Sequence, residues 1–149
     1  MRKFVFKLDP ILKQRQRLEE IAQKNFAEAM AELKTVQQKI LRKQEEINTC
    51  FDLSPMVNNN RVDVNRLVEN RRFVEHMYIE LQELNEERVQ KETIASHKQH
   101  FLMTAAKEKE SMKRFKEKKK ESWQKEMLAE EQRNLDEVGL QMSQRSVWR

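Results

Sequence analysis

The stretch AQKNFAEAMAELKTVQQKILRKQEEINTC, residues 22–50, decides the fold. Its seam residues recur in alternating steps of four and three, an average of 3.5, which is the period of an α-helical coiled coil. Eight of the nine seam positions are apolar. Lys43 is the exception, and it either extends its ammonium to solvent or marks the register of the pair. The seam positions are Ala22, Phe26, Ala29, Leu33, Val36, Ile40, Lys43, Ile47 and Cys50.

Start and stop signals bound this helix and predict a second one. Asp9 is a good N-cap and Pro10 fits the first helical position, so the first helix is predicted over about 10–51. Pro55 and three consecutive Asn at 58–60 predict a turn over about 52–62. A second helix follows over about 63–142, with Asp63 as its N-cap. Its seam is predicted at Val64, Leu67, Val74, Met77 or Tyr78, Leu81 and Leu84, then more weakly at Arg88, Glu92, Ala95 and Gln99, and again at Phe101, Leu102 and Ala105.

The two helices are predicted to pack as an antiparallel coiled-coil hairpin, an all-α fold with a much longer second helix and a single domain over 1–149. The composition agrees, because one Gly and two Pro cannot supply the turns of a β or α/β fold. Pairing the first helix back from the turn uses the second helix only to about Thr104. Some forty residues are then expected to lack a partner within the chain, so that they fray, self-associate or enter another protein.

The expected overhang has a distinctive charge pattern. Residues 107–125 contain nine Lys and Arg against four Glu, and residues 126–137 contain five acids against one Arg. Apolar groups are interleaved: Met112, Phe115, Trp123, Met127, Leu128, Leu135 and Val138. We interpret this as an interaction surface; the alternative is a solvated helix stabilised by local Glu–Lys pairs.

Several functions are excluded or disfavoured. One glycine cannot form a phosphate-binding loop, and no residue pattern places a base beside a nucleophile, so we expect no enzyme and no cofactor. His97 and His100 are read as surface histidines rather than metal ligands. Cys50 cannot form an intrachain disulfide, and no apolar run is long enough for a membrane span. The net charge of +5 is small against 55 charged groups, and the acidic block would repel phosphates, so no nucleic-acid partner is expected.

Taken together, the features resemble those of the FliJ family, the small coiled-coil component of the bacterial flagellar type III export apparatus. The similarity covers essentially the whole chain. It is carried by residues 4–15, by the Ala-rich first helix (Ala22, Ala27, Ala29, Ala31) and the Asn-rich turn, by residues 72–77, and by residues 123–126 and 134–138 with their closing Leu-Asp-Glu.

The resemblance implies a non-enzymatic stalk that couples the export ATPase hexamer to the export-gate membrane protein. Its apposed ends would enter the ATPase pore, and the end near the turn would meet the gate. It would also escort export chaperones, in the cytoplasm at the inner-membrane apparatus. The pore contacts implied are Lys13, Arg15, Lys113, Arg114, Lys118, Lys119, Lys120 and Trp123.

The resemblance also implies a gate contact early in the second helix. It would consist of an aromatic residue and the apolar residues that follow it, here Phe73, Met77 and Leu84. Glu80 departs from the family, which tends to have a small residue there. Seam packing is the alternative role for all three, most of all for Leu84, whereas Phe73 lies one position off the seam. The equivalent stalk of a virulence-type secretion system and a generic coiled-coil adaptor are the competing readings, and the oligomeric state of the isolated chain stays open.

Overall fold

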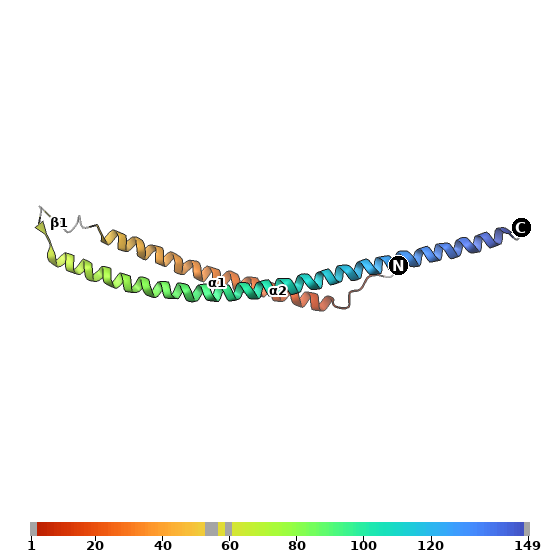
Figure 1. The fold of residues 1–149 in the computed structure, drawn as a ribbon, viewed down its shortest axis with the longest axis horizontal. Coiled ribbons are helices and arrows are strands. Elements are labelled where there is room, and N and C mark those ends of the chain that lie inside the picture. The colour runs from red at the N-terminus through yellow and green to blue at the C-terminus, as the bar shows by residue number, and fades with distance from the viewer. Residues whose placement is uncertain (1–2, 53–56, 59–60, 148–149) are drawn as a thin grey trace. The chain divides into compact units, whose positions relative to one another are not determined.

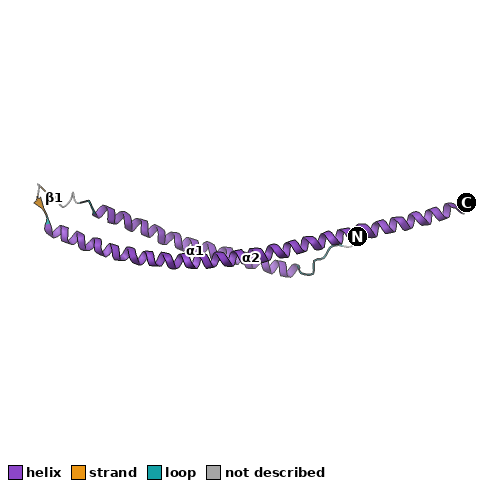
Figure 2. Ribbon diagram, viewed as in Figure 1, coloured by secondary structure: helices purple, strands orange, loops and turns teal. Residues whose placement is uncertain are grey.

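The computed structural model describes residues 3–52, 57–58 and 61–147. It contains two helices, α1 (Asp9–Cys50) and α2 (Val64–Val147), which pack against each other (Figure 1). Two short strands, β1 (Val57–Asn58) and β2 (Arg61–Val62), lie between them, and almost all the rest of the described chain is helical (Figure 2). The predicted all-α hairpin with a longer second helix is confirmed.

The helix ends follow the local chemistry. The Asp63 carboxylate accepts hydrogen bonds from the amides of Asn65 (3.1 Å) and Arg66 (3.3 Å), so Asp63 is the N-cap of α2, as predicted. At its other end α2 continues to Val147, five residues past the predicted end near 142. Gly139 does not end the helix, because one glycine costs only about 1 kcal/mol relative to alanine.

The turn contains a feature that the sequence reading missed. β1 and β2 pair antiparallel, with Val57 opposite Val62 and Asn58 opposite Arg61. Such a ribbon joins two antiparallel segments with a very short connection. Pro55, Asn59 and Asn60, on which the turn prediction partly rested, lie outside the described residues.

The chain divides into two compact units, each built from parts of both helices. One unit is Glu20–Met103, and its core lies between α1 and α2. Every predicted seam position on α1 is buried or half-buried, including Lys43, and Val36 retains only 3% of its exposure. The buried seam residues of α1 in this unit are Ala29, Leu33, Val36, Ile40 and Ile47. The coiled-coil prediction for this stretch is confirmed.

The α2 side of this core differs in part from the predicted seam. Met77 and Ala95 are buried, but Val64 and Tyr78 are exposed. Lys91 and Lys98 occupy the interface in place of the predicted Glu92 and Gln99, and the predicted Phe101 is 68% exposed. The difference is one position at residues 92 and 99, because the steps of three and four continue from Met77 through residues 81, 84, 88, 91, 95, 98 and 102, the last of which was also predicted. Long basic side chains satisfy this pattern by burying their stems.

The other unit comprises Met1–Glu19 and Thr104–Arg149. Leu12 of α1 is buried there, and residues 3–8 form a non-helical segment against α2, with a turn at residues 7–8. Contacts from this segment reach Trp123, and Met127 is still half-buried. Among the described residues, the stretch of α2 without a partner is therefore 128–147, about half the expected overhang.

The register explains the shorter overhang. The Asn70 side chain donates a hydrogen bond of 2.9 Å to the carbonyl of Cys50, so the last residue of α1 lies opposite the second turn of α2, not its start. Each α1 residue consequently meets a partner further along α2 than simple pairing from the turn assumes. Residues 3–6 then cover further turns of α2, because a residue outside a helix can span about twice the rise of a helical one.

Candidate functional site

Residues 3–8 form what we call the strap, which holds the start of α1 to α2 in the Met1–Glu19 and Thr104–Arg149 unit. The Phe4 ring packs on Trp123 at 5.8 Å between centroids, and the Phe6 ring packs on Phe115 at 6.0 Å. Lys116 lies 5.7 Å above the Phe6 ring and donates a 2.6 Å hydrogen bond to Asp9. The available sequence signal was weak: Phe4, Phe6 and Leu8 recur at every second position, as on one face of an extended segment, but Val5 between them is also apolar.

Three of the implied pore residues are engaged within this unit. Arg15 forms an ion pair with Glu108, and Trp123 packs against the strap. Lys13 lies 3.7 Å from Asp9 but keeps 68% of its side chain exposed. Arg15 and Trp123 therefore contribute to the fold of the unit, and Lys13 is the only one of the three that presents most of its surface to solvent.

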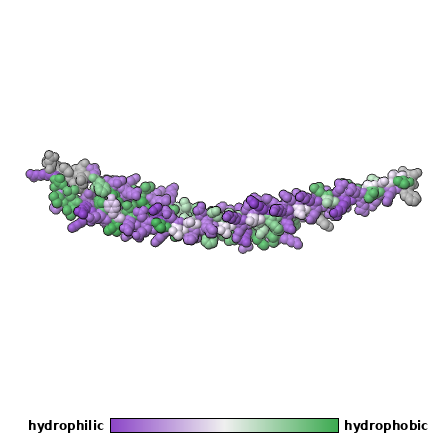
Figure 3. All heavy atoms as spheres, viewed as in Figure 1, coloured by the Kyte–Doolittle hydropathy of each residue, from purple (hydrophilic) through white to green (hydrophobic). Residues whose placement is uncertain are grey.

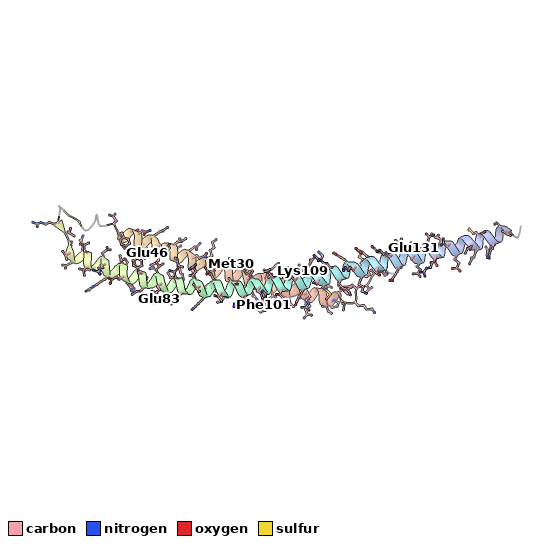
Figure 4. The ribbon with its side chains drawn as sticks, in the orientation of Figure 1. Met30, Glu46, Glu83, Phe101, Lys109 and Glu131 are labelled. Atoms are coloured by element: carbon pink, nitrogen blue, oxygen red, sulfur yellow. The ribbon has the colours of Figure 1, made fainter. Side chains whose placement is uncertain are left out.

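The remaining implied pore residues lie on the exposed surface of α2. Lys113, Lys118 and Lys120 have no acidic partner within ion-pair distance among the residues that the structure describes. Arg114 has a 3.5 Å contact with Glu110 of its own helix, and Lys119 lies 5.5 Å above the Phe115 ring. By contrast, Lys109 and Lys116, which face α1, are paired with Glu19 and Asp9. Figure 4 labels Lys109 of this paired set.

A groove of about 440 Å³ lies along the strap, lined by residues 4–8 together with Phe115 and Lys119. Val5 is 78% exposed at its edge. The groove is mainly apolar with a cationic border, so this unit combines aromatic and positively charged surface.

The implied gate residues have three different environments. Phe73 is 53% exposed on α2, Leu84 is half-buried, and Met77 retains only 2% of its exposure. Met77 thus packs between the helices and presents almost no surface to a partner. Glu80, where the sequence departs from the family, is held within the hairpin: its carboxylate lies 2.6 Å from Lys43 and 3.0 Å from Nε2 of His76.

Exposed apolar side chains gather around the start of α2 and the end of α1, where Figure 3 shows a concentration of hydrophobic surface. They include Phe51, Val62, Val64, Val68 and Phe73. A groove of about 500 Å³ lies among Cys50, Phe51, Leu67, Asn70, Arg71, Val74, Glu75 and Tyr78. An apolar surface of this kind on a helical hairpin is typical of a protein-binding region.

The polar contacts across the helices shift the pKa values of their members. The hydrogen bond from Lys43 lowers the pKa of Glu80, and that from Lys91 lowers the pKa of Glu32. The same bonds raise the pKa of each lysine. The hydrogen bond from Lys116 likewise lowers the pKa of Asp9. All these groups are thus fixed in their charged forms near neutral pH and act as structural contacts rather than as acids or bases.

Within the described ranges, no group of three or more His, Cys, Asp or Glu side chains has the arrangement of a metal site. No described helix is long and apolar enough to cross a membrane. The surfaces that remain are the cationic stretch of α2 beyond residue 112 and the apolar surface near the turn.

These features define a two-helix coiled-coil hairpin with separate surfaces for protein partners. The chain matches the family model described as flagellar FliJ protein over residues 4–147, and it belongs to that family. It is accordingly a non-enzymatic stalk component of flagellar type III export. No curated protein and no solved structure matches the chain significantly.

Proposed function

We propose that this chain couples the flagellar export ATPase ring to the export gate, acting in the cytoplasm at the inner-membrane export apparatus, and that it escorts export chaperones. The strap and the cationic stretch of α2 would enter the pore of the ATPase hexamer. The apolar surface near the turn would meet the cytoplasmic part of the gate protein. Differential contact with pore loops in different nucleotide states would then bias the ring without any chemistry in the stalk.

The observation that carries the pore proposal is the contrast between two sets of lysines on one helix. Lys109 and Lys116 are neutralised by α1, whereas Lys113, Lys118 and Lys120 have no acidic partner among the described residues. Unpaired surface cations contribute little to folding and are available to an acidic partner. The positive stretch therefore suits a pore lined with acidic loops.

The experiment measures stimulation of the purified export ATPase by the full chain. Replacing Lys113, Lys118 and Lys120 with Glu should raise the concentration for half-maximal stimulation about tenfold or more, most strongly at low salt. The matched control replaces Lys24, Lys34 and Lys39, which are also exposed, with Glu. If both triple variants lost stimulation of the ATPase equally, the loss would be due to the change in net charge, and the proposed pore contact would be refuted.

For the gate, we propose that Phe73 makes the direct contact, while Met77 and Leu84 hold the helix surface in place from the interface side. Phe73→Ala should weaken binding to the purified cytoplasmic part of the gate protein about tenfold and leave thermal melting nearly unchanged. Met77→Ala should lower the melting temperature instead, because its side chain is buried.

Ile79→Ala is the control for the gate experiment, since Ile79 is 57% exposed on another side of α2. Binding measured by titration calorimetry should be unaffected by this change. If Phe73→Ala binds the gate protein as tightly as the parent chain, the contact lies elsewhere on the hairpin.

A further inference from the structure

Five ion pairs join α1 to α2. In the Glu20–Met103 unit, Lys43 pairs with Glu80 at 2.6 Å and Glu32 pairs with Lys91 at 2.8 Å. In the other unit, Glu19 pairs with Lys109, Arg15 with Glu108 and Asp9 with Lys116. Charged groups at such positions are the usual means by which a coiled coil specifies its register.

The sequence of α2 repeats three of these five partners one heptad later. Seven residues after Glu80, Lys91 and Lys109 come residues of the same charge, namely Glu87, Lys98 and Lys116. Seven residues before them come residues that carry no charge, namely Phe73, Leu84 and Leu102. Displacing α2 by one heptad in one direction therefore preserves these three charge pairs, and places Phe115 and Trp123 where Arg15 and Asp9 now have Glu108 and Lys116. The opposite displacement preserves only one of the five pairs, with Lys109 in place of Lys116 opposite Asp9.

The structure places both possible acceptors of Lys43 around one groove. This groove, of about 510 Å³, is lined by Lys39, Arg42, Lys43 and Glu46 of α1 and by Glu80, Glu83, Leu84 and Glu87 of α2. Figure 4 labels Glu46 and Glu83 of this lining. The carboxylate of Glu87 also contributes to the raised pKa of Lys91. Glu87, the alternative partner of Lys43, thus lines the same groove as Lys43 and its present partner Glu80.

The two helices contribute unequally to the packing between these pairs. From residue 88 to residue 98 the α2 side of the interface consists of Arg88, Lys91, Ala95 and Lys98. α2 thus contributes flexible stems and one methyl group to this stretch, whereas the large buried apolar groups, Leu33 and Val36, come from α1. After a one-heptad displacement, Ile47 would exchange Met77 for Leu84, which has a similar volume.

We propose that the hairpin has a second register, in which each α1 residue faces α2 one heptad later, a displacement of about 10 Å. Two contacts hold the present register: the strap, and the hydrogen bond from the Asn70 side chain to the Cys50 carbonyl. The strap's partners Phe115 and Trp123 are replaced seven residues later by Ser122 and Glu130, which offer no ring to Phe6 or Phe4. Displacement requires that the strap and the Asn70–Cys50 hydrogen bond both be released.

The second register gives a stalk a means to transmit a change from one end to the other. A partner that captured the strap would shift the populations of the two registers, and the displacement would appear at the turn. This consequence rests on the proposed function, whereas the existence of two registers does not.

Disulfide cross-linking of the full chain in a Cys50→Ser background tests the proposal. The present ion pairs place Ala29 opposite Ala95, so Ala29→Cys with Ala95→Cys reports the present register. Ala29→Cys with Leu102→Cys reports the second register, because residues 95 and 102 lie about 10 Å apart and a disulfide spans only about 4.4–6.8 Å between Cα atoms. Ala29→Cys with Gln99→Cys gives the baseline, since Gln99 faces solvent.

Two variants with equal charge removal make the test specific. Glu80→Gln with Lys91→Gln removes contacts of the present register, and Glu87→Gln with Lys98→Gln removes those of the second. The first should raise the 29–102 cross-linking rate at least fivefold over baseline, and so should Phe4→Ala with Phe6→Ala. The second should not raise it. A 29–102 rate at baseline in both the Glu80/Lys91 and the strap variants, with the 29–95 bond still forming, would overturn the proposal.

Discussion

The Glu20–Met103 unit and residues 128–147 are built from the same kinds of residue, yet they differ completely in packing. In the first, Val36 and Met77 retain 3% and 2% of their exposure. In the second, every described residue is exposed, with Leu128 and Leu135 at 66% each and Met142 at 69%. Figure 4 labels Glu131 within this bare stretch. The same helix thus passes from a paired to an unpaired state.

The difference shows that helix formation and burial have separate causes in this chain. Strong helix formers continue α2 where there is no partner, but only the facing helix or strap removes apolar surface from water. Apolar groups spaced at 128, 135 and 142 recur every heptad without a facing helix among the described residues. This spacing is what a partner helix or pore would require, and the intramolecular fold does not use it.

The largest expected effect comes from one substitution made in both regions. Val36→Ala should lower the free energy of unfolding by about 2 kcal/mol, because it removes buried methyl groups and leaves a cavity. Val138→Ala should change it by less than about 0.5 kcal/mol, and in the stabilising direction, since Val138 is 50% exposed and alanine is the better helix former.

Urea denaturation followed by circular dichroism measures both variants of this pair. A comparable loss from Val138→Ala would mean that residues 128–147 already have a partner in solution, for example a second copy of the chain. Repeating the denaturation at two protein concentrations identifies that case, because stability then depends on concentration.

An intermediate effect is expected from the strap. Phe4→Ala with Phe6→Ala removes two ring contacts, each worth about 0.5–1.5 kcal/mol beyond the area it buries. The fluorescence of Trp123, isolated by Trp148→Phe, should shift to longer wavelength as its ring becomes hydrated. Val5→Ala is the control, because Val5 is 78% exposed. An unchanged emission spectrum in the double variant would show that the strap does not cover Trp123 in solution.

Most of the fold could be predicted from the sequence, because a 3.5-residue period directly encodes a helix with one packed face. The α1 seam is confirmed at all nine positions, and Asp63 is the N-cap expected of a carboxylate there. The register could not be predicted, since the pairing depends on the conformation of the turn and not on either helix alone. That uncertainty is why the overhang was overestimated.

The candidate site was less accessible to sequence reasoning. Periodicity placed either Met77 or Tyr78 in the interface, and only the structure shows that it is Met77. The strap contacts join residues more than a hundred positions apart, such as Phe6 and Phe115, which no local pattern relates. Conversely, the charge excess of residues 107–125 was readable, but not which of its lysines α1 neutralises.

The smallest expected effect is a difference between the paired region and residues 128–147 in how their charged groups make stability depend on pH. The lowered pKa values of Asp9, Glu32 and Glu80 mean that their contribution to stability is complete above the ordinary carboxyl values of 3.8 and 4.5 and is lost as the pH falls through the lowered values. The pKa values of Lys43 and Lys91 are raised above 10.5, so their contribution is complete below that pH and is lost as the pH rises further. Melting temperature should therefore be nearly constant between these limits.

Glu80→Gln should flatten the acid side of this profile by an amount on the order of a degree, because exposed ion pairs contribute little and are screened by salt. Glu83→Gln is the matched control: Glu83 lines the same groove but forms no ion pair among the described residues. Residues 128–147 contain acidic groups with no α1 partner in the described part of the chain, so Glu131→Gln should leave the profile unchanged. If Glu80→Gln and Glu131→Gln altered the profile equally, the acid loss would reflect overall net charge, and the ion pairs across the helices would not distinguish the paired region from the bare one.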